Sequence, residues 1–125
     1  MSRKWTVLLV AVAGLLAVVP SYAHHGTAAY DAAKNVTITG TVTAFNFLNP
    51  HVLIDVDVKS ATGTIEKWQG EMTSPNHLAR MGWNKNTLKP GDQVTLVGSG
   101  AKSGAPTMVI HKVLKNGQEI QLDTE

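Results

Sequence analysis

The chain has 125 residues, of which 43% are hydrophobic, with 11 Lys and Arg, nine Asp and Glu, and no cysteine. This length accommodates one domain, and the hydrophobic fraction excludes a fully disordered chain. Residues 1–23 contain Arg3 and Lys4 but no acidic residue, so nine basic and nine acidic residues remain in the rest. Nonspecific nucleic-acid binding needs clustered Lys and Arg, and we therefore expect no nucleic-acid partner.

Residues 1–23 have the pattern of a secretory signal peptide. Arg3 and Lys4 precede an apolar stretch over residues 5–19, and a helix-breaking segment then ends in the small residue Ala23. The stretch is shorter than the roughly 20 apolar residues of a membrane-spanning helix. We predict export to the bacterial periplasm or the medium, cleavage after Ala23 and no stable membrane span afterwards. An uncleaved membrane anchor is the alternative.

The next residues are predicted to form an N-terminal arm and then a first strand. Residues 24–34 show no clear strand alternation, which indicates the arm. Val36, Ile38 and Val42 then alternate with threonines, which predicts a strand that begins near residue 35. Gly40 lies on the apolar side of this strand, where a bend or bulge suits a small barrel.

The middle of the chain is predicted to contain a hairpin followed by a short helix. After an Asn-Pro turn, residues 51–58 and 64–72 have the pattern of two paired strands. Ser74 and Pro75 are typical of a helix start, and Gly82 is typical of a helix end.

The last third is predicted to contain two or three further strands. The predicted segments are a strand at 93–97, a loose loop at 98–106, a strand at 107–114 and a short strand at 119–122. An Asn-Gly pair at 116–117 favours a hairpin between the last two strands. The element order predicts an all-β domain over residues 35–125, a small OB-like barrel of five or six strands with one short helix between strands 3 and 4. Another small barrel or a β-sandwich would give a similar pattern.

Several short motifs are spread over the mature chain. They are His24-His25-Gly26, Tyr30-Asp31, Gly40-Thr41-Val42, Asn49-Pro50-His51-Val52, Trp68 with Glu71, Pro75-Asn76 with Leu78, Arg80, Gly82 and Trp83, and Leu88-Lys89-Pro90-Gly91-Asp92. Together they resemble a family of small exported bacterial proteins catalogued as a domain of unknown function. The resemblance implies an exported β-domain and no established activity.

The histidines indicate a metal site. If cleavage follows Ala23, His24 has a free α-amine beside its own imidazole, and one ion can be chelated by both nitrogens. A second imidazole would complete a three-nitrogen planar site, the arrangement called a histidine brace in copper proteins. Tetragonal nitrogen ligation favours Cu(II). We predict His51 as the second ligand, because it begins a strand beside a turn, and His25 is the alternative. A solvated terminus without metal is the competing interpretation.

The remaining polar and aromatic candidates have simpler interpretations. His77 and Met81 share a helix face and could offer nitrogen and sulfur to Cu(I), although such a Met is more often a core residue. We expect His111 to be a surface or hydrogen-bonded residue, and Asp55 and Asp57 to be solvated carboxylates rather than a catalytic pair. Glu71 is expected to hold a ligand imidazole or to pair with Arg80. Trp68 and Trp83 are expected in the core, with a sugar-type stacking surface as the alternative. Nothing in the sequence brings a serine and a histidine together.

Three functions remain open from the sequence. The first is an exported binding module that holds a transition metal, with copper as the expected metal, through His24 and His51 and with His25 as the further candidate ligand. The second is a metal-free barrel domain that binds a small ligand or another exported protein. The third, less favoured, is a small copper enzyme, because a mature chain this short leaves little room for a closed substrate pocket.

Overall fold

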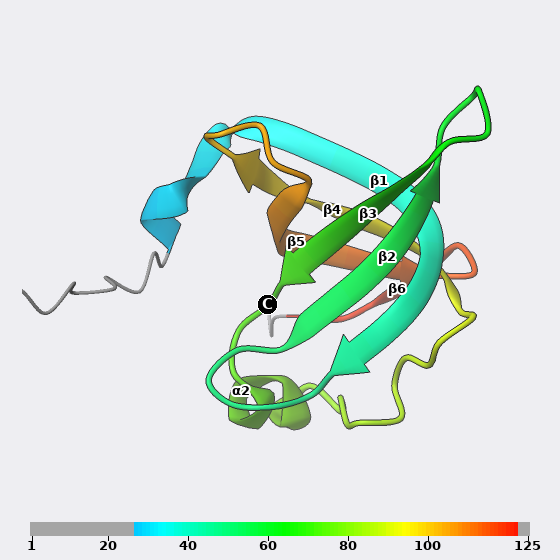
Figure 1. Ribbon diagram of the computed structural model, residues 1–125. Helices are drawn as coiled ribbons and strands as arrows, with labels where there is room; N and C mark the ends of the chain where they lie inside the picture. Colours follow the sequence, from blue (N-terminus) through cyan, green and yellow to red (C-terminus); the bar gives the residue numbers. More distant parts are fainter. Residues whose placement is uncertain (1–26, 123–125) are drawn as a thin grey trace, which may run out of the picture.

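The computed structural model describes residues 27–122, which form a curved β-sheet with two short helices (Figure 1). The elements in chain order are η1 (Thr27–Ala29), β1 (Tyr30–Asn46), β2 (Leu53–Lys59), β3 (Ile65–Glu71), α2 (Pro75–Arg80), β4 (Gln93–Ala101), β5 (Thr107–Lys115) and β6 (Gln118–Ile120). In this part of the chain, no helix is long and apolar enough to cross a membrane.

The sheet closes into a barrel. Its strand order is β3-β2-β1-β4-β5-β6 with antiparallel neighbours, and a parallel pairing of β3 with β5 joins the two sides. Five strands therefore form the barrel, and β6 extends the edge of β5. The helix α2 lies between β3 and β4 in sequence and at one end of the barrel in space (Figure 1). The predicted OB-like fold, with its helix between strands 3 and 4, is confirmed.

Alternate residues of the strands fill the barrel interior. The buried core residues include Ile38, Val42, Val52, Ile54, Val56, Met72, Leu78, Trp83, Leu88, Val94, Leu96, Met108, Ile110 and Val113. Trp83 and Trp68 contribute to this interior as expected, Trp83 as a buried residue and Trp68 as a half-buried residue packed against the core. The core residues come from β1, β2, β4 and β5, from the positions next to the β2–β3 pair, from α2 and from the segment after it, so the helix closes one end of the core.

Gly40 permits a close approach between strands. A Cβ atom at this position would lie 2.3 Å from the backbone oxygen of Asp57 on β2, a distance that real Cβ atoms do not show. The register shift that bends β1 lies between Val42 and Ala44. Gly40 is therefore needed for the close contact between β1 and β2, and the bulge in β1 follows it between Val42 and Ala44.

The loop predicted at 98–106 is wrong in its first half. Strand β4 continues through Gly98 and Ser99 to Ala101. A Cβ at Gly98 would lie 1.8 Å from the backbone oxygen of Val109, so only glycine allows β5 this close. The Gly and Ser residues that indicate a loop in the sequence therefore serve close packing between strands.

The predicted arm is also strand from residue 30 on. Between Tyr30 and Asn35 the pairing of β1 with β4 is irregular, because four residues of β1 lie opposite the single residue Gly100. The amide of Ala33 donates to the Asp31 side chain within this bulge. Regular alternation is lost there, which explains why the pattern does not predict a strand.

The predicted helix start and final hairpin are both confirmed. Ser74 is the N-cap of α2, its hydroxyl accepting from the His77 amide, and Pro75 occupies the first turn. Asn116 and Gly117 both have positive φ, as a tight hairpin between β5 and β6 requires.

Candidate metal centre

His51 lies at the rim of the barrel, in the loop between β1 and β2. It follows Pro50, whose peptide bond with Asn49 is cis. The Val52 amide donates to the Thr73 oxygen, and the Val52 oxygen accepts from the Met72 amide. These bonds extend the β2–β3 ladder by one position beyond the start of β2 and the end of β3. Since Val52 is fully buried and neighbouring side chains alternate, His51 points outward, and its side chain is 49% exposed.

Glu71 holds the ring of His51. Leu53 and Glu71 are directly opposite each other in the β2–β3 register, which places the carboxylate beside the rim loop. The His51 Nδ1 atom lies 2.5 Å from Glu71 Oε1. Because an ionised carboxylate can only accept a hydrogen bond, the proton of this pair is on Nδ1. In the neutral ring, Nε2 then has the free lone pair that a metal ion requires.

Tyr30 engages the other oxygen of the same carboxylate. Its hydroxyl donates to Glu71 Oε2 over 3.4 Å. Burial raises the pKa of the Tyr30 phenol above its ordinary value near 10, the negative charge of Glu71 raises it further, and a hydrogen bond with Thr107 acts in the opposite direction. Tyr30 is therefore a protonated donor at neutral pH. We call His51, Glu71 and Tyr30 the rim cluster.

The chain enters the fold at this rim. Tyr30 is the first residue of β1, and η1 directly precedes it. The backbone oxygen of Ala29 accepts from the Lys102 amide at 3.0 Å, which fixes the end of η1 on the loop between β4 and β5. Glu71 links His51 to the start of β1, because it contacts both His51 and Tyr30. His24 and His25, the other two predicted ligands, lie outside the described residues.

Residues 27–122 by themselves contain no group of three His, Cys, Asp or Glu side chains arranged to hold a metal ion. His51 is thus a single imidazole with one ring nitrogen available, and Glu71 has both oxygens engaged by its two neighbours. A metal site at this rim needs further ligands. The two histidines that the sequence analysis proposed precede η1.

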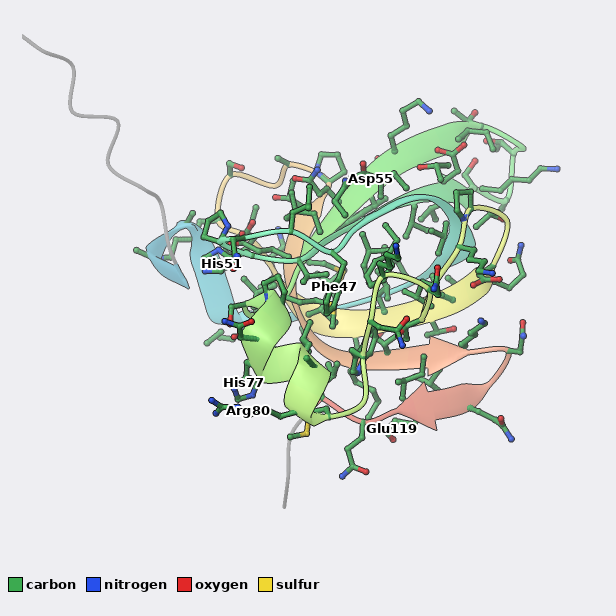
Figure 2. The ribbon with its side chains drawn as sticks, turned by 90° about the horizontal axis from the view of Figure 1, so that it is seen from below. Phe47, His51, Asp55, His77, Arg80 and Glu119 are labelled. Atoms are coloured by element: carbon green, nitrogen blue, oxygen red, sulfur yellow. The ribbon has the colours of Figure 1, made fainter. Side chains whose placement is uncertain are left out.

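The helix candidates do not join the rim cluster. Figure 2 shows His77 and Arg80 on α2, directed away from the barrel. Met81 packs against the core, as expected of a core residue. Of the two partners considered for Glu71, the structure has His51 rather than Arg80.

The two aspartates of β2 face outward and have structural partners. Asp55 accepts from the Gln69 amide at 2.9 Å, and Asp57 lies 3.3 Å from the Lys67 ammonium, both across the β2–β3 ladder. They belong to an open hollow of about 430 Å³, the β2–β3 hollow, lined by Thr43, Asp55, Val56, Asp57, Lys67, Trp68, Gln69, Pro106 and Thr107. Their partners support the expectation of outward-facing carboxylates over that of a catalytic pair.

A serine and a histidine that the sequence analysis left apart do meet. Ser99 Oγ and His111 Nε2 are 2.8 Å apart, across β4 and β5. Ser99 is only 5% exposed. The pair stabilises the strand contact, and His111 is the exposed, hydrogen-bonded residue that was expected. The pair could be predicted only from the β4–β5 register, and that register is known only if β4 is known to extend past Gly98.

Comparison with known proteins identifies the family. A family model described as a family of unknown function (DUF6152) matches residues 12–110. The chain belongs to the DUF6152 family. The matched range of this DUF6152 chain includes His24, His25 and His51. No curated protein matches the sequence.

Solved structures resemble the DUF6152 barrel in fold. The crystal structure of Rim1, a mitochondrial single-stranded DNA binding protein from S. cerevisiae, matches with a TM-score of 0.52 and 9% identity over 68% of this chain and 95% of that chain. A ZRD-deleted mutant of TiaS in complex with agmatine matches with a TM-score of 0.46 and 20% identity, over 74% of this chain but only 25% of that chain. At 9% identity, the similarity to Rim1 concerns the fold alone.

Proposed function

We propose that this protein is an exported binding module that holds a copper ion through His24 and His51, with His25 as the alternative ligand. The observation that supports the proposal best is the His51–Glu71 pair, because a carboxylate on Nδ1 is the usual partner of a metal-binding histidine. The proposal includes removal of residues 1–23 during export, which gives His24 its free α-amine.

The position of His51 suits a ligand that comes from the N-terminus. His24 precedes Thr27 by three residues, so its Cα is within about 11 Å of the Thr27 Cα at full extension. Tyr30, at the other end of η1, is linked to His51 through Glu71. The tether is short, which keeps the amine at high local concentration near the rim.

The donor set favours Cu(II) among the common metals. An α-amine and two imidazoles are three nitrogen donors, and nitrogen ligation of tetragonal geometry is typical of Cu(II), which also has the highest affinity in the divalent series. The chain has no cysteine, so thiolate sites of the zinc-finger type are excluded.

The test is a copper titration of protein exported and processed by a bacterial host, with its N-terminus determined by mass spectrometry. We expect one Cu(II) per chain with a nitrogen-rich electron paramagnetic resonance spectrum. One extra residue ahead of His24 removes the amine chelate and is expected to weaken binding by about 100-fold or more, in line with apparent metal affinities that depend on each ligand.

Two substitutions complete this test. His51→Ala is expected to weaken Cu(II) binding. The matched control is His111→Gln, which removes an imidazole whose Nε2 atom is engaged by Ser99 and retains a partner for Ser99. Equal affinity of the native and the extended protein, or cleavage anywhere other than before His24, would contradict the proposal.

A metal-free ligand-binding barrel is the second candidate. It is favoured by the β2–β3 hollow, since this face of OB-folds is commonly the binding face. The carboxylates of Asp55 and Asp57 make it unsuited to a nucleic-acid backbone. Metal analysis of protein purified from the periplasm separates the two functions, and a turnover assay of the copper-loaded protein then tests the less favoured copper enzyme.

A further inference from the structure

We infer that Tyr30 is a positioning residue for the copper site, acting through Glu71 to fix both the ring of His51 and the point at which the N-terminal arm reaches it. This inference rests on the proposed function. In this arrangement Tyr30 does not contact the metal. It contributes by positioning the two proposed ligands, the His51 ring and the N-terminal His24.

The first step is the hydrogen-bond chain itself. Tyr30 donates to one oxygen of Glu71, and the other oxygen accepts from His51 Nδ1. A carboxylate held at both oxygens cannot rotate freely about its terminal torsion. The plane of the imidazole is therefore defined by a residue on β1 as well as by one on β3. His51 alone, half exposed in a loop, lacks such a constraint from packing.

The second step is the place of Tyr30 in the chain. Within the described residues it is the first strand residue after η1, and Ala101 lies opposite it in the ladder. The next regular pair is Asn35 with Ser99, beyond the bulge. The contact with Glu71 thus holds the start of β1 where regular pairing is interrupted. The backbone bond from the Lys102 amide to the Ala29 oxygen is a second anchor of this segment.

The two steps have a joint consequence for affinity. The amine of His24 and the Nε2 atom of His51 belong to segments that are 27 residues apart in the sequence. Tyr30 connects the start of β1 to His51 through one carboxylate, so the ring of His51 and the point from which the N-terminal residues extend are fixed before the metal arrives. Preorganisation of this kind increases affinity by lowering the ordering cost of binding.

The test measures Cu(II) affinity by competition with a chelator, using processed protein that begins at His24. Tyr30→Phe, which keeps the ring and removes the hydroxyl, is expected to weaken binding by about threefold to tenfold, and Glu71→Gln by about tenfold or more, as for other partners of metal-binding histidines. Asp55→Asn is the matched control, since it alters an outward carboxylate that hydrogen-bonds Gln69 and is expected to leave the affinity unchanged.

A double-mutant cycle separates positioning from general stability. The effect of Tyr30→Phe is expected to disappear when His51 is already alanine, because the hydroxyl acts through that ring. The copper spectrum of Tyr30→Phe is expected to broaden or shift, a readout that a change in folding stability alone would not move.

The outcomes are distinct for the two proposals. If His51→Ala weakens binding but Tyr30→Phe and Glu71→Gln do not, the positioning role is wrong and the copper site stands. If Tyr30→Phe weakens binding equally with and without His51, the role is also wrong. If His51→Ala itself has no effect, the proposed function fails.

Discussion

At the scale of single residues, a charged side chain in a turn of the barrel has specific partners that change its titration. Asp92 illustrates this in the turn before β4. Its Oδ2 atom accepts from the Lys89 amide at 2.9 Å and lies 3.1 Å from the Lys115 ammonium. The backbone hydrogen bond from Lys89 is the main cause that lowers the pKa of Asp92 below its ordinary value, and Lys115 adds to it.

The lowered pKa of Asp92 predicts a pH dependence of stability. A carboxyl group with a lower pKa in the folded state contributes stability that is complete above its unfolded pKa, about 3.9, and is lost as the pH falls through its folded pKa. Asp92→Asn is therefore expected to reduce the free energy of unfolding at pH 6, by less than about 1 kcal/mol because the pair is near the surface. The difference should shrink below pH 4. Urea unfolding at pH 6 and pH 3 measures it, and a difference that grows on acidification would contradict the assignment.

At the scale of elements, the strands depend on glycines whose reason is visible only across the ladder. Gly98 and Gly70 are both buried, but their surroundings differ. A Cβ at Gly98 meets the backbone of Val109, whereas a Cβ at Gly70 meets the Cδ1 atom of the Ile110 side chain at 2.3 Å. A side-chain end can move aside, but a paired backbone cannot move without loss of the ladder.

This difference predicts unequal costs for the same substitution. Gly98→Ala is expected to lower the free energy of unfolding by about 3 kcal/mol or more, and Gly70→Ala by about 1 kcal/mol, within the range for overpacked interiors. Urea denaturation with matched probes compares the two variants. A larger loss for Gly70→Ala would show that the β4–β5 contact adjusts more easily than its backbone geometry indicates.

The sequence predicts the elements that have local signals and misses the strand segment that depends on distant contacts. Val36 to Val42 alternates with threonines, and Ser74-Pro75 and Asn116-Gly117 have local signals, so these elements follow from neighbouring residues. Residues 98–101 are small residues that suit a loop by composition. Their place in a strand is explained by close contacts with distant residues, of Gly98 with Val109 and of Gly100 with Val36.

The candidate site likewise contains residues that the sequence predicts and a contact that it does not predict. His51 is predictable from its turn and its place at a strand start, and Glu71 is predictable as an acid that either holds a ligand imidazole or pairs with Arg80. That Glu71 rather than another acid meets His51 depends on the register of β2 with β3, in which Leu53 lies opposite Glu71. Tyr30 is 21 residues before His51 and 41 before Glu71, and no local pattern predicts its contact with Glu71.

At the scale of the whole molecule, Trp83 links the segment after α2 to the end of β1 and to the C-terminal segment of the described chain. It is 2% exposed, its ring centroid lies 6.1 Å from that of Phe45, and its indole nitrogen donates to the backbone oxygen of Gln121 at 2.7 Å. The segment after α2 thus holds the segment after β6 against the end of the barrel. A single side chain connects the helix region, β1 and the C-terminal segment.

Removal of this connection is expected to have a large effect. Trp83→Ala should lower the free energy of unfolding by about 3–5 kcal/mol, the usual cost of deleting a buried aromatic side chain. Trp83→Phe, which retains most of the ring but leaves the Gln121 oxygen without its donor, should cost about 1–3 kcal/mol. Thermal and urea unfolding measure both. Equal losses for the two variants would assign the contribution to the hydrogen bond rather than to packing.

The bulge at the start of β1 has a consequence for local opening. Residues 31–34 lie between two regular pairs and opposite one glycine, so this stretch can separate from β4 while the ladder from Asn35 onward remains intact. We expect its amide hydrogens to exchange with deuterium faster than those of residues 36–42. If copper joins the N-terminus to His51, the added protection should be confined to residues 27–34. Uniform slowing across β1 would instead indicate that the strand opens as one cooperative unit, and the bulge would then not separate two regions of different stability.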